Sequence, residues 1–167
     1  MSNTETEYKF LVKDPSWIKD IVEFHAIKQS YLVNDGIKNV RIRSSNRNCE
    51  SHVEYTMTVK SCEEGATRSE VELEIEQGQY ETLLELADTS YEKKRFMVPY
   101  NVDPLTNNAE SYWEIDVFPD GLTIAEMEVF DFEFNRSNLP SWIGEEVTDK
   151  KEYYNAELAK RYDSNDS

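Results

Sequence analysis

Two carboxylates and an ammonium group alternate within residues 5–9, whose sequence is Glu-Thr-Glu-Tyr-Lys. Because side chains two positions apart in a β-strand share a face, Glu5, Glu7 and Lys9 would point to the same side. Carboxylate oxygens bind Mg²⁺ or Mn²⁺, and an ammonium group binds phosphate. The stretch therefore has two interpretations. It is either a strand with a solvated polar face, or a strand that presents metal and phosphate ligands to a cavity.

The same alternation recurs along the chain, and the charges on each polar face are mostly of one sign. Basic side chains occupy the polar faces at Arg41, Arg43, Lys60, Lys93 and Arg95. Acidic side chains occupy the others, at Glu5, Glu7, Glu70, Glu72, Glu114, Asp116, Glu126 and Glu128. Apolar residues fill the positions between them, so each of these stretches has one charged and one apolar face.

Strands and helices that would position these side chains follow from the spacing of apolar residues. Period-two alternation predicts seven or eight strands, at 4–12, 31–33, 38–44, 52–61, 68–76, 93–98, 112–118 and 122–130. Helical spacing predicts three helices, at 15–27, 79–88 and 150–162. Turn residues predict loops over 99–108 and mixed structure over 131–148. The expected fold class is α+β, dominated by an antiparallel sheet.

The length of 167 residues and the formal net charge of -16 narrow the classes of protein that remain. The length predicts a single domain over 1–162, followed by a frayed tail over 163–167. The negative charge argues against nucleic acid or an anionic membrane as the main partner. We find no apolar run long enough to span a membrane and no signal peptide.

Cysteines and histidines give no sign of a metal site or of a disulfide framework. Cys49 and Cys62 lack the spacing of metal ligands, which favours a reduced, cytoplasmic protein. His25 and His52 are isolated, so structural roles in the core or at the surface are expected for both. The chemistry of this chain is therefore expected to come from the charged strands.

Two architectures place the charged faces differently. In a twisted sheet whose apolar face is covered by helices, the charges would face water. In a closed antiparallel barrel of about eight strands, the interior is just wide enough for side chains or one small ligand. If the charges point inward there, the lumen is a polar tunnel, and the three predicted helices cover the apolar outer face. The alternation alone leaves both architectures open.

A resemblance to a known family favours the second architecture. Residues 5–9 fit the Glu-x-Glu-x-Lys signature of the CYTH superfamily, the triphosphate tunnel metalloenzymes, and later motifs follow in the family's order over nearly the whole chain. Residues 112–128 and 140–155 most resemble the short bacterial members, which cleave inorganic triphosphate. The resemblance implies a closed eight-stranded antiparallel β-barrel, or tunnel, with a charged interior, outer helices and a C-terminal helix.

The resemblance also implies roles for the charged residues. Guanidinium and ammonium groups match phosphate oxygens, so the phosphate ligands would be Lys9, Arg41, Arg43, Lys60, Lys93 and Arg95. Mg²⁺ or Mn²⁺ would be held by Glu5, Glu7 and Glu128. Glu126, with Glu70 or Glu72, would bind a second ion or place the attacking water. Asp116 resembles a further acidic site residue, Lys60 is expected to be needed for turnover, and Glu114 ranks below them.

One departure from the family concerns the closing helix. The family often has an acidic and a basic residue before the position of Tyr153, where this chain has Asp149-Lys150-Lys151-Glu152. Lys150 or Lys151 would have to make the contact that closes the tunnel. A solvated helix face is the alternative for both lysines.

The expected activity is metal-dependent hydrolysis of inorganic triphosphate to pyrophosphate and phosphate. Within the same superfamily, the alternatives are a nucleoside or thiamine triphosphatase and a class IV-type adenylate cyclase. A non-catalytic triphosphate-binding module is a third possibility. The expected partner is a small triphosphate, with no nucleic acid and no membrane, and the protein is expected to be a monomer or homodimer.

Overall fold

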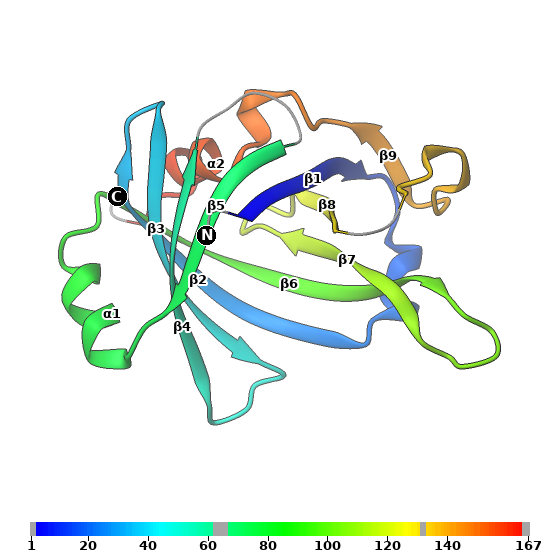
Figure 1. Ribbon diagram of the computed structural model, residues 1–167, viewed down its shortest axis with the longest axis horizontal. Coiled ribbons are helices and arrows are strands. Elements are labelled where there is room, and N and C mark those ends of the chain that lie inside the picture. The colour runs from blue at the N-terminus through cyan, green and yellow to red at the C-terminus, as the bar shows by residue number, and fades with distance from the viewer. Residues whose placement is uncertain (1–2, 62–66, 131–132, 165–167) are drawn as a thin grey trace.

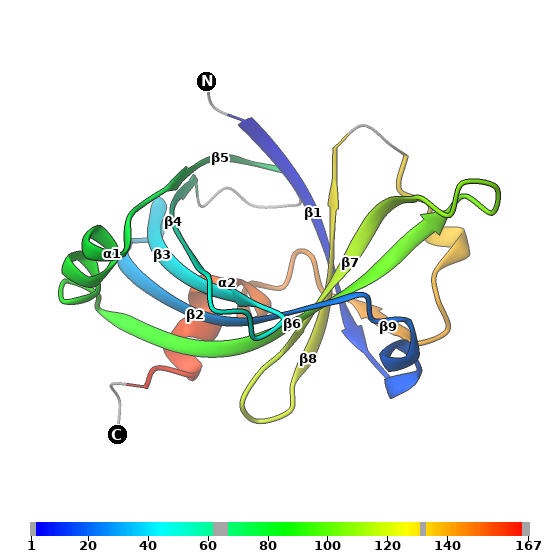
Figure 2. The ribbon, with the colours of Figure 1, turned by 90° about the horizontal axis from the view of Figure 1, so that it is seen from below.

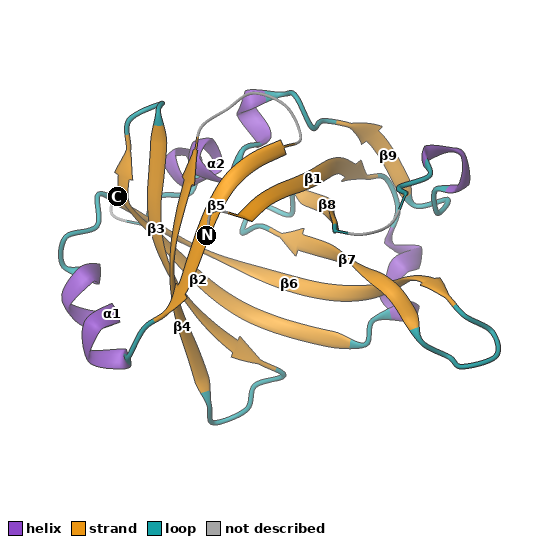
Figure 3. Ribbon diagram, in the orientation of Figure 1, coloured by secondary structure: helices purple, strands orange, loops and turns teal. Residues whose placement is uncertain are grey.

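Within residues 3–61, 67–130 and 133–164, which the computed structural model describes, nine β-strands form one antiparallel sheet (Figures 1 and 3). For residues 3–5, 67 and 68 the description covers the backbone alone. The strands are β1 (Asn3–Val12), β2 (Glu23–Asn34), β3 (Lys38–Arg47), β4 (Val53–Ser61), β5 (Thr67–Glu74), β6 (Thr89–Val102), β7 (Ala109–Val117), β8 (Thr123–Val129) and β9 (Ile143–Glu146). Their order is β5-β4-β3-β2-β6-β7-β8-β1-β9. The predicted α+β class with a dominant antiparallel sheet is confirmed.

The sheet curls strongly, so that its two sides approach each other (Figure 2). Residues 3–6 of β1 pair with residues 67–70 of β5, and the following residues of β1 pair with β8. Among the described residues, the remainder of β5 pairs with β4 alone. The structure thus corrects the predicted eight-stranded closed barrel to a nine-stranded curled sheet. This sheet is bridged at one place and is not closed along its length.

The predicted helix over 15–27 is wrong in its second half. A short 3-10 helix, η1 (Pro15–Asp20), is capped by Asp14, whose carboxylate accepts a hydrogen bond from the Ser16 backbone N–H at 3.0 Å. The backbone then becomes extended, and β2 begins at Glu23. The β-branched and aromatic residues that follow favour a strand, and their pairing with β6 overrides the helical spacing.

Several other elements also differ from the expected bounds. β2 extends far beyond the predicted strand at 31–33, and β9 was not predicted. β6 continues into the predicted loop at 99–108, because Pro99 lies beyond the end of β2, where its missing N–H is tolerated. The predicted helix at 79–88 is observed as α1 (Gln77–Leu84). The last helix is split into η3 (Lys151–Tyr153) and α2 (Asn155–Arg161), and η2 (Arg136–Asn138) precedes β9.

The apolar outer face of the sheet carries the larger hydrophobic core, built around Trp113. Its ring contacts Phe10 and Trp142 edge-on, with ring centroids 5.8 and 5.6 Å apart. Trp17 of η1 packs on the same outer face. α1 covers another part of this face, where its Tyr80 packs against Tyr55 of β4. The loop before β9 therefore covers much of this face, and η1 and α1 cover further parts, while Val59, Val71 and Leu73 of β4 and β5 remain exposed.

α2 does not cover the outer face as predicted. Its Leu158 and Ala159 pack against Tyr91 and Ile124 in a second cluster. Those two residues lie two positions from Lys93 and Glu126, on the charged face of their strands. α2 therefore closes one end of the concave face, because the apolar residues of β6 and β8 at that end give it a surface to bury. No helix in the described part of the chain is long and apolar enough to cross a bilayer.

Candidate active site

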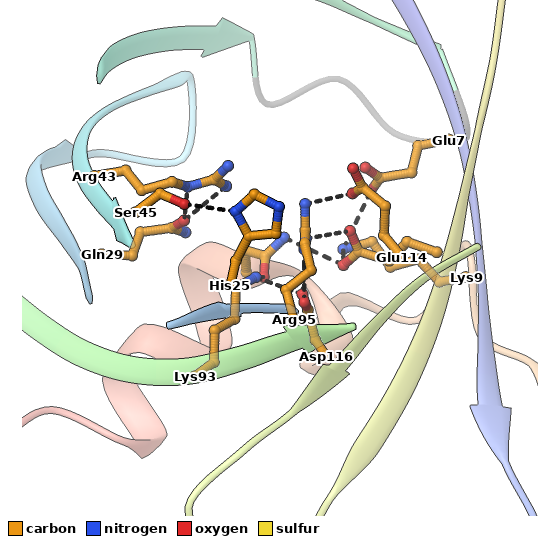
Figure 4. Close-up of polar contacts among 12 residues, drawn as sticks. Glu7, Lys9, His25, Gln29, Arg43, Ser45, Lys93, Arg95, Glu114 and Asp116 are labelled. Carbon is orange, nitrogen blue, oxygen red and sulfur yellow. Dashed lines mark hydrogen bonds and ion pairs between the residues drawn. The ribbon is translucent and has the colours of Figure 1, made fainter. Parts of the chain in front are cut away.

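Strand register brings the charged residues onto one face. Lys9 of β1 lies opposite Glu126 of β8, Glu126 lies opposite Glu114 of β7, and Asp116 of β7 lies opposite Arg95 of β6. Directly opposed residues of antiparallel strands point to the same side. Figure 4 shows Lys9, Arg95, Glu114 and Asp116 converging over the concave face.

Burial decides between the two architectures expected from the sequence. Several of the charged residues are buried, with an exposed fraction of 7% or less. They are Lys9, Arg41, Lys60, Lys93, Arg95, Asp116 and Glu126. Charged residues are almost never buried this deeply unless they are paired or serve a ligand. The alternative in which the charged faces are solvated is therefore wrong for these residues.

Arg95 is the centre of the densest group of ion pairs. Its guanidinium binds Asp116 bidentately, with Nε–Oδ1 and Nη2–Oδ2 distances of 2.7 and 2.8 Å. It also donates to Glu126 at 3.2 Å and to Glu114. Burial opposes its charge, but the carboxylates of Asp116 and Glu114 outweigh that effect and raise the pKa of Arg95 further. Arg95 is therefore a fixed cation that is largely neutralised by its neighbours.

Lys93 lies beside this pair and contacts Asp116. Its Nζ donates to Asp116 and, at 3.2 Å, to Oδ1 of Asn155. Burial lowers the pKa of Lys93 to about 8, although the carboxylate of Asp116 acts in the opposite direction. The pKa of Asp116 is lowered, because Arg95 and Lys93 together outweigh the effect of its burial. The pair is thus ionised at neutral pH, and Lys93 begins to lose its charge near pH 8.

Glu126 connects β8 to the ion pairs of β1. Lys9 Nζ donates to Glu126 Oε1 at 3.1 Å and lies 3.3 Å from Glu7 Oε1. Burial would raise the pKa of Glu126, but the nearby charges of Lys9 and Arg95 hold it well below its usual value. Glu126 is therefore an anionic acceptor at neutral pH.

Two pairs of like charges lie opposite each other on this face. Glu7 lies opposite Glu128, and Glu114 lies opposite Glu126. Such pairs repel, and a cation between them relieves the repulsion. Burial, followed by the charges of Glu126 and Asp116, raises the pKa of Glu114 even though Arg95 lowers it. The carboxylate set thus has the chemistry of a site for a divalent cation.

We call this side of the concave face the acidic wall. It consists of Glu7, Lys9, Lys93, Arg95, Glu114, Asp116, Glu126 and Glu128. Among the described residues, no three acidic, histidine or cysteine side chains are grouped closely enough to hold a metal ion. Glu5 lies in β1 opposite Arg68, and its side chain is outside the described part of the chain.

The other side of the concave face, formed by β3 and β4 with β5, is richer in basic groups. We call it the basic wall, and it consists of Arg41, Arg43 and Lys60 with Glu70 and Glu72. Lys60 Nζ is 2.7 Å from Glu70 Oε2, and Arg41 is buried beside them in β3. Arg43 makes both of its described hydrogen bonds to the side-chain amide of Gln29. Glu72 is exposed and accepts a hydrogen bond from Thr58 at 3.0 Å.

The structure brings most of the predicted site residues together, but their catalytic and binding roles stay predictions. Lys9, Lys93, Arg95, Asp116 and Glu126 form one continuous network. Glu72 lies apart from that network, on the opposite wall and in contact with solvent.

Three residues near the network were not assigned from the sequence. Gln29 and Tyr91 are fully buried on the concave face, and Asn155 of α2 contacts both Lys93 and Glu126. If residues 25–31 had been treated as a strand, Gln29 would have been placed on the same face as His25 and Tyr31. The helix predicted over 15–27 prevented that interpretation. Tyr91 and Asn155 carry no charge, so the search for charged faces missed them.

His25 also lies on this face, beyond Gln29. Its Nδ1 is 2.9 Å from Ser45 Oγ (Figure 4), and its Nε2 is 2.6 Å from Glu23 Oε1. Both ring nitrogens thus have polar partners. The structural role that the sequence suggested for this histidine stays a prediction.

The two lysines considered for closing the tunnel lie elsewhere. Lys150 pairs with Glu145, and Lys151 is exposed at the start of η3. In the described part of the chain, Asn155 is the residue through which the C-terminal segment hydrogen-bonds to the charged groups of the acidic wall.

Comparison with known proteins gives relatives that cover almost the whole chain. An inorganic triphosphatase of Acetivibrio thermocellus is 31% identical over 159 residues, which is 93% of each chain. An inorganic triphosphatase of Nitrosomonas europaea is 34% identical over 166 residues, covering 93% of this chain and 97% of that protein. No protein-family profile matches the chain.

Solved structures give the same result. The inorganic triphosphatase NE1496 superposes with a TM-score of 0.56 at 28% identity, over 93% of each chain. The PH1819 protein of Pyrococcus horikoshii, at 21% identity and a TM-score of 0.59 over 77% of this chain and 79% of that one, shares the fold. A curled sheet with buried charges on its concave face is the arrangement expected of a protein that handles polyanions. The chain belongs to the family of the inorganic triphosphatases named above, as its resemblance to the short bacterial members predicted.

Proposed function

We propose that the protein hydrolyses inorganic triphosphate to pyrophosphate and phosphate in a metal-dependent reaction. The observation that carries the proposal is the burial of basic and acidic side chains from both walls on one concave face, in a chain of this family. A triphosphate brings several negative charges into a small volume. Buried guanidinium and ammonium groups stabilise such an anion far more strongly than solvated ones do.

The basic wall would hold the phosphates of the substrate. Strand register places Arg41, Arg43 and Lys60 on the concave face. Figure 4 shows Arg43 on one side of this face and Lys9, Lys93 and Arg95 on the other. Phosphoryl transfer depends mostly on positioning and on stabilising charge in the transition state. Cations on two facing walls would do both, because they bind the chain of phosphates at several points.

The acidic wall would hold Mg²⁺ or Mn²⁺. Glu7 and Glu128 would be ligands, with Glu5 beside them on β1, and their repulsion supports this assignment. The ion supplies Lewis-acid stabilisation of phosphoryl oxygens and lowers the pKa of bound water. Glu126, kept anionic by Lys9 and Arg95, would orient the attacking water or a second ion, with Glu70 or Glu72 on the opposite side.

The curled sheet brings the two walls face to face. The pairing of residues 3–6 with 67–70 joins β1 to the far strand of the sheet at one place. A substrate held between the walls would be shielded from part of the bulk water, which strengthens its electrostatic contacts.

We further propose a cytoplasmic location and a small-molecule substrate, with no nucleic acid or membrane as partner. The exposed free thiol of Cys49 and the net charge of -16 support this view. Fractionation of cells producing the protein, with a labelled antibody, tests the location.

A substrate panel tests the proposed reaction. With Mg²⁺ or Mn²⁺, purified protein should release phosphate from tripolyphosphate much faster than from pyrophosphate or ATP, and EDTA should abolish the release. Equal rates on all three would contradict the specificity. Preferred turnover of thiamine triphosphate, formation of cyclic AMP from ATP, or thermal stabilisation by tripolyphosphate without turnover would favour the alternatives.

A further inference from the structure

A continuous chain of hydrogen bonds runs behind the two walls. Arg43 donates from Nε and Nη2 to Gln29 Oε1 at 3.1 and 2.9 Å. Gln29 Nε2 donates to the hydroxyls of Tyr31 and Tyr91 at 3.0 and 3.1 Å. The Tyr91 hydroxyl donates to Asn155 Oδ1 at 3.3 Å. Figure 4 shows Gln29 directly below the guanidinium of Arg43.

The two ends of the chain fix the direction of every bond in it. Arg43 can only donate, so the oxygen of the Gln29 amide must face it, and the amide nitrogen must face the tyrosines. Tyr91 therefore accepts from Gln29 and uses its own proton for Asn155. The Asn155 oxygen also accepts from Lys93, so its nitrogen faces Glu126, 3.5 Å away. If either amide were flipped, two hydrogen-bond donors or two acceptors would face each other.

Two arginines of the concave face, the buried Arg95 and the partly exposed Arg43, have opposite kinds of partner. Arg95 is bound by three carboxylates, which offset its charge. In the described part of the chain, Arg43 has no carboxylate within ion-pair distance, and its anchor is a neutral amide. A neutral acceptor fixes one edge of the guanidinium and leaves the charge, with the Nη1 group, for another ligand.

We propose that Gln29 is a positioning residue for triphosphate, which keeps Arg43 oriented and un-neutralised so that its guanidinium binds a phosphate group. The inference rests on the proposed function, because it assumes that a phosphate reaches Arg43. Gln29 is fully buried and makes hydrogen bonds to Arg43, Tyr31 and Tyr91, so its side chain has one orientation.

An isosteric change of charge tests the first part of the inference. Gln29→Glu places a carboxylate against Arg43, so its charge is offset before the substrate arrives. KM for tripolyphosphate should rise about 10- to 100-fold, the usual worth of a charged hydrogen bond, while kcat changes much less. Gln77→Glu adds the same charge on the exposed start of α1 and should leave KM unchanged. An unchanged KM in Gln29→Glu would overturn the proposal.

A neutral substitution tests whether Gln29 acts through Arg43. Gln29→Met removes the acceptor without adding charge and should raise KM about 5- to 10-fold. In an Arg43→Gln background the same substitution should have no further effect on KM, because the residue that it positions is gone. Full additivity of the two substitutions would overturn the proposal. If Gln29→Glu does not fold, the Gln29→Met variant still tests the positioning role of Gln29.

Calorimetric titration with tripolyphosphate in EDTA separates this inference from the proposed reaction. If the wild-type protein binds tripolyphosphate without cleaving it, the proposed reaction fails. The Gln29 and Arg43 variants are then compared by their dissociation constants instead of their KM values. If the wild-type protein neither cleaves nor binds it, both proposals fail. If it cleaves tripolyphosphate and the Gln29 variants match it in KM, only the positioning role fails.

Discussion

The two walls of the concave face differ in how their charges are balanced. On the acidic wall every basic side chain has a carboxylate partner within 3.2 Å, and Arg95 has several. On the basic wall Lys60 pairs with the carboxylate of Glu70, and Arg43 donates to a neutral amide. Paired charges hold a strand face rigid, and unneutralised cations bind anions. The difference supports the proposed binding of phosphate to the basic wall, and the proposed metal ion on the acidic wall stays a prediction.

The most severe disruption is expected on the acidic wall, from Glu126→Gln. The substitution keeps the shape of the side chain but removes the anion that Lys9 and Arg95 share. Turnover should fall by about 100- to 1,000-fold, as for loss of one preorganised electrostatic group. Phosphate release from tripolyphosphate measures it, with circular dichroism to show that the fold survives. Glu92→Gln, at an exposed position of β6, is the control, and equal loss in both variants would contradict the assignment.

Lys60→Ala is expected to break the basic wall. It removes a buried cation and leaves Glu70 without the ion pair made at 2.7 Å. Turnover should be lost, and tripolyphosphate should bind about 10- to 100-fold more weakly, because a charged contact with the substrate is lost together with the cation that offsets Glu70. Calorimetry measures the binding, with the exposed Lys19→Ala as control. Full activity in Lys60→Ala would mean that the basic wall does not contact substrate.

The dependence of KM on pH tests whether the charge of Lys93 on the acidic wall contributes to substrate binding. Its pKa of about 8 means that the ammonium charge is present below pH 8 and is lost above it. KM for tripolyphosphate should therefore rise about tenfold between pH 7 and pH 9.5. Lys93→Arg keeps its charge over that range and should flatten the rise. Parallel profiles in the two proteins would exclude Lys93 as the cause.

The stability of the unliganded protein should change in the opposite direction through the same group. Between pH 8 and 10.5 the unfolded chain retains the proton on Lys93 that the folded protein has released. The unfolded state then binds more protons, so this group makes the free energy of unfolding rise with pH across that window. Urea denaturation of wild type and Lys93→Arg at several pH values measures the difference.

The smallest effect is expected where the two walls are joined, at Tyr91→Phe. The change removes the hydroxyl between Gln29 and Asn155 but leaves Gln29 bonded to Tyr31. The loss should cost about 1 kcal/mol of stability and change KM by about twofold or less. Thermal denaturation and steady-state kinetics measure both, and the exposed Tyr112→Phe is the matched control. A loss of turnover like that of Glu126→Gln would show that the walls act as one unit.

Alternation of charge and apolarity predicted the acidic wall well, because β7 and β8 have a buried apolar residue at every second position. The same reading failed at residues 21–27, where Trp17 and Ile21 suit a helix and a strand equally. Contact with β6 decides the outcome, and no local pattern contains that contact.

The hydrogen-bonded chain behind the walls was beyond prediction for a different reason. Gln29, Tyr91 and Asn155 meet across separations of more than 60 residues, and none carries a charge that would mark its face. α2 could be predicted as a helix, but its position over the concave face depends on its contact with Tyr91 of β6 and Ile124 of β8, which no local pattern contains.

The three tryptophans, Trp17, Trp113 and Trp142, all lie in the aromatic core on the outer face, on the opposite side of the sheet from the charged groups. Intrinsic fluorescence of this protein therefore reports on that outer layer. Emission should shift when the layer comes apart in denaturant and should stay nearly constant when an anion or metal ion binds on the other side. The chain thus carries its own optical probe of unfolding, one that works equally well for every site variant.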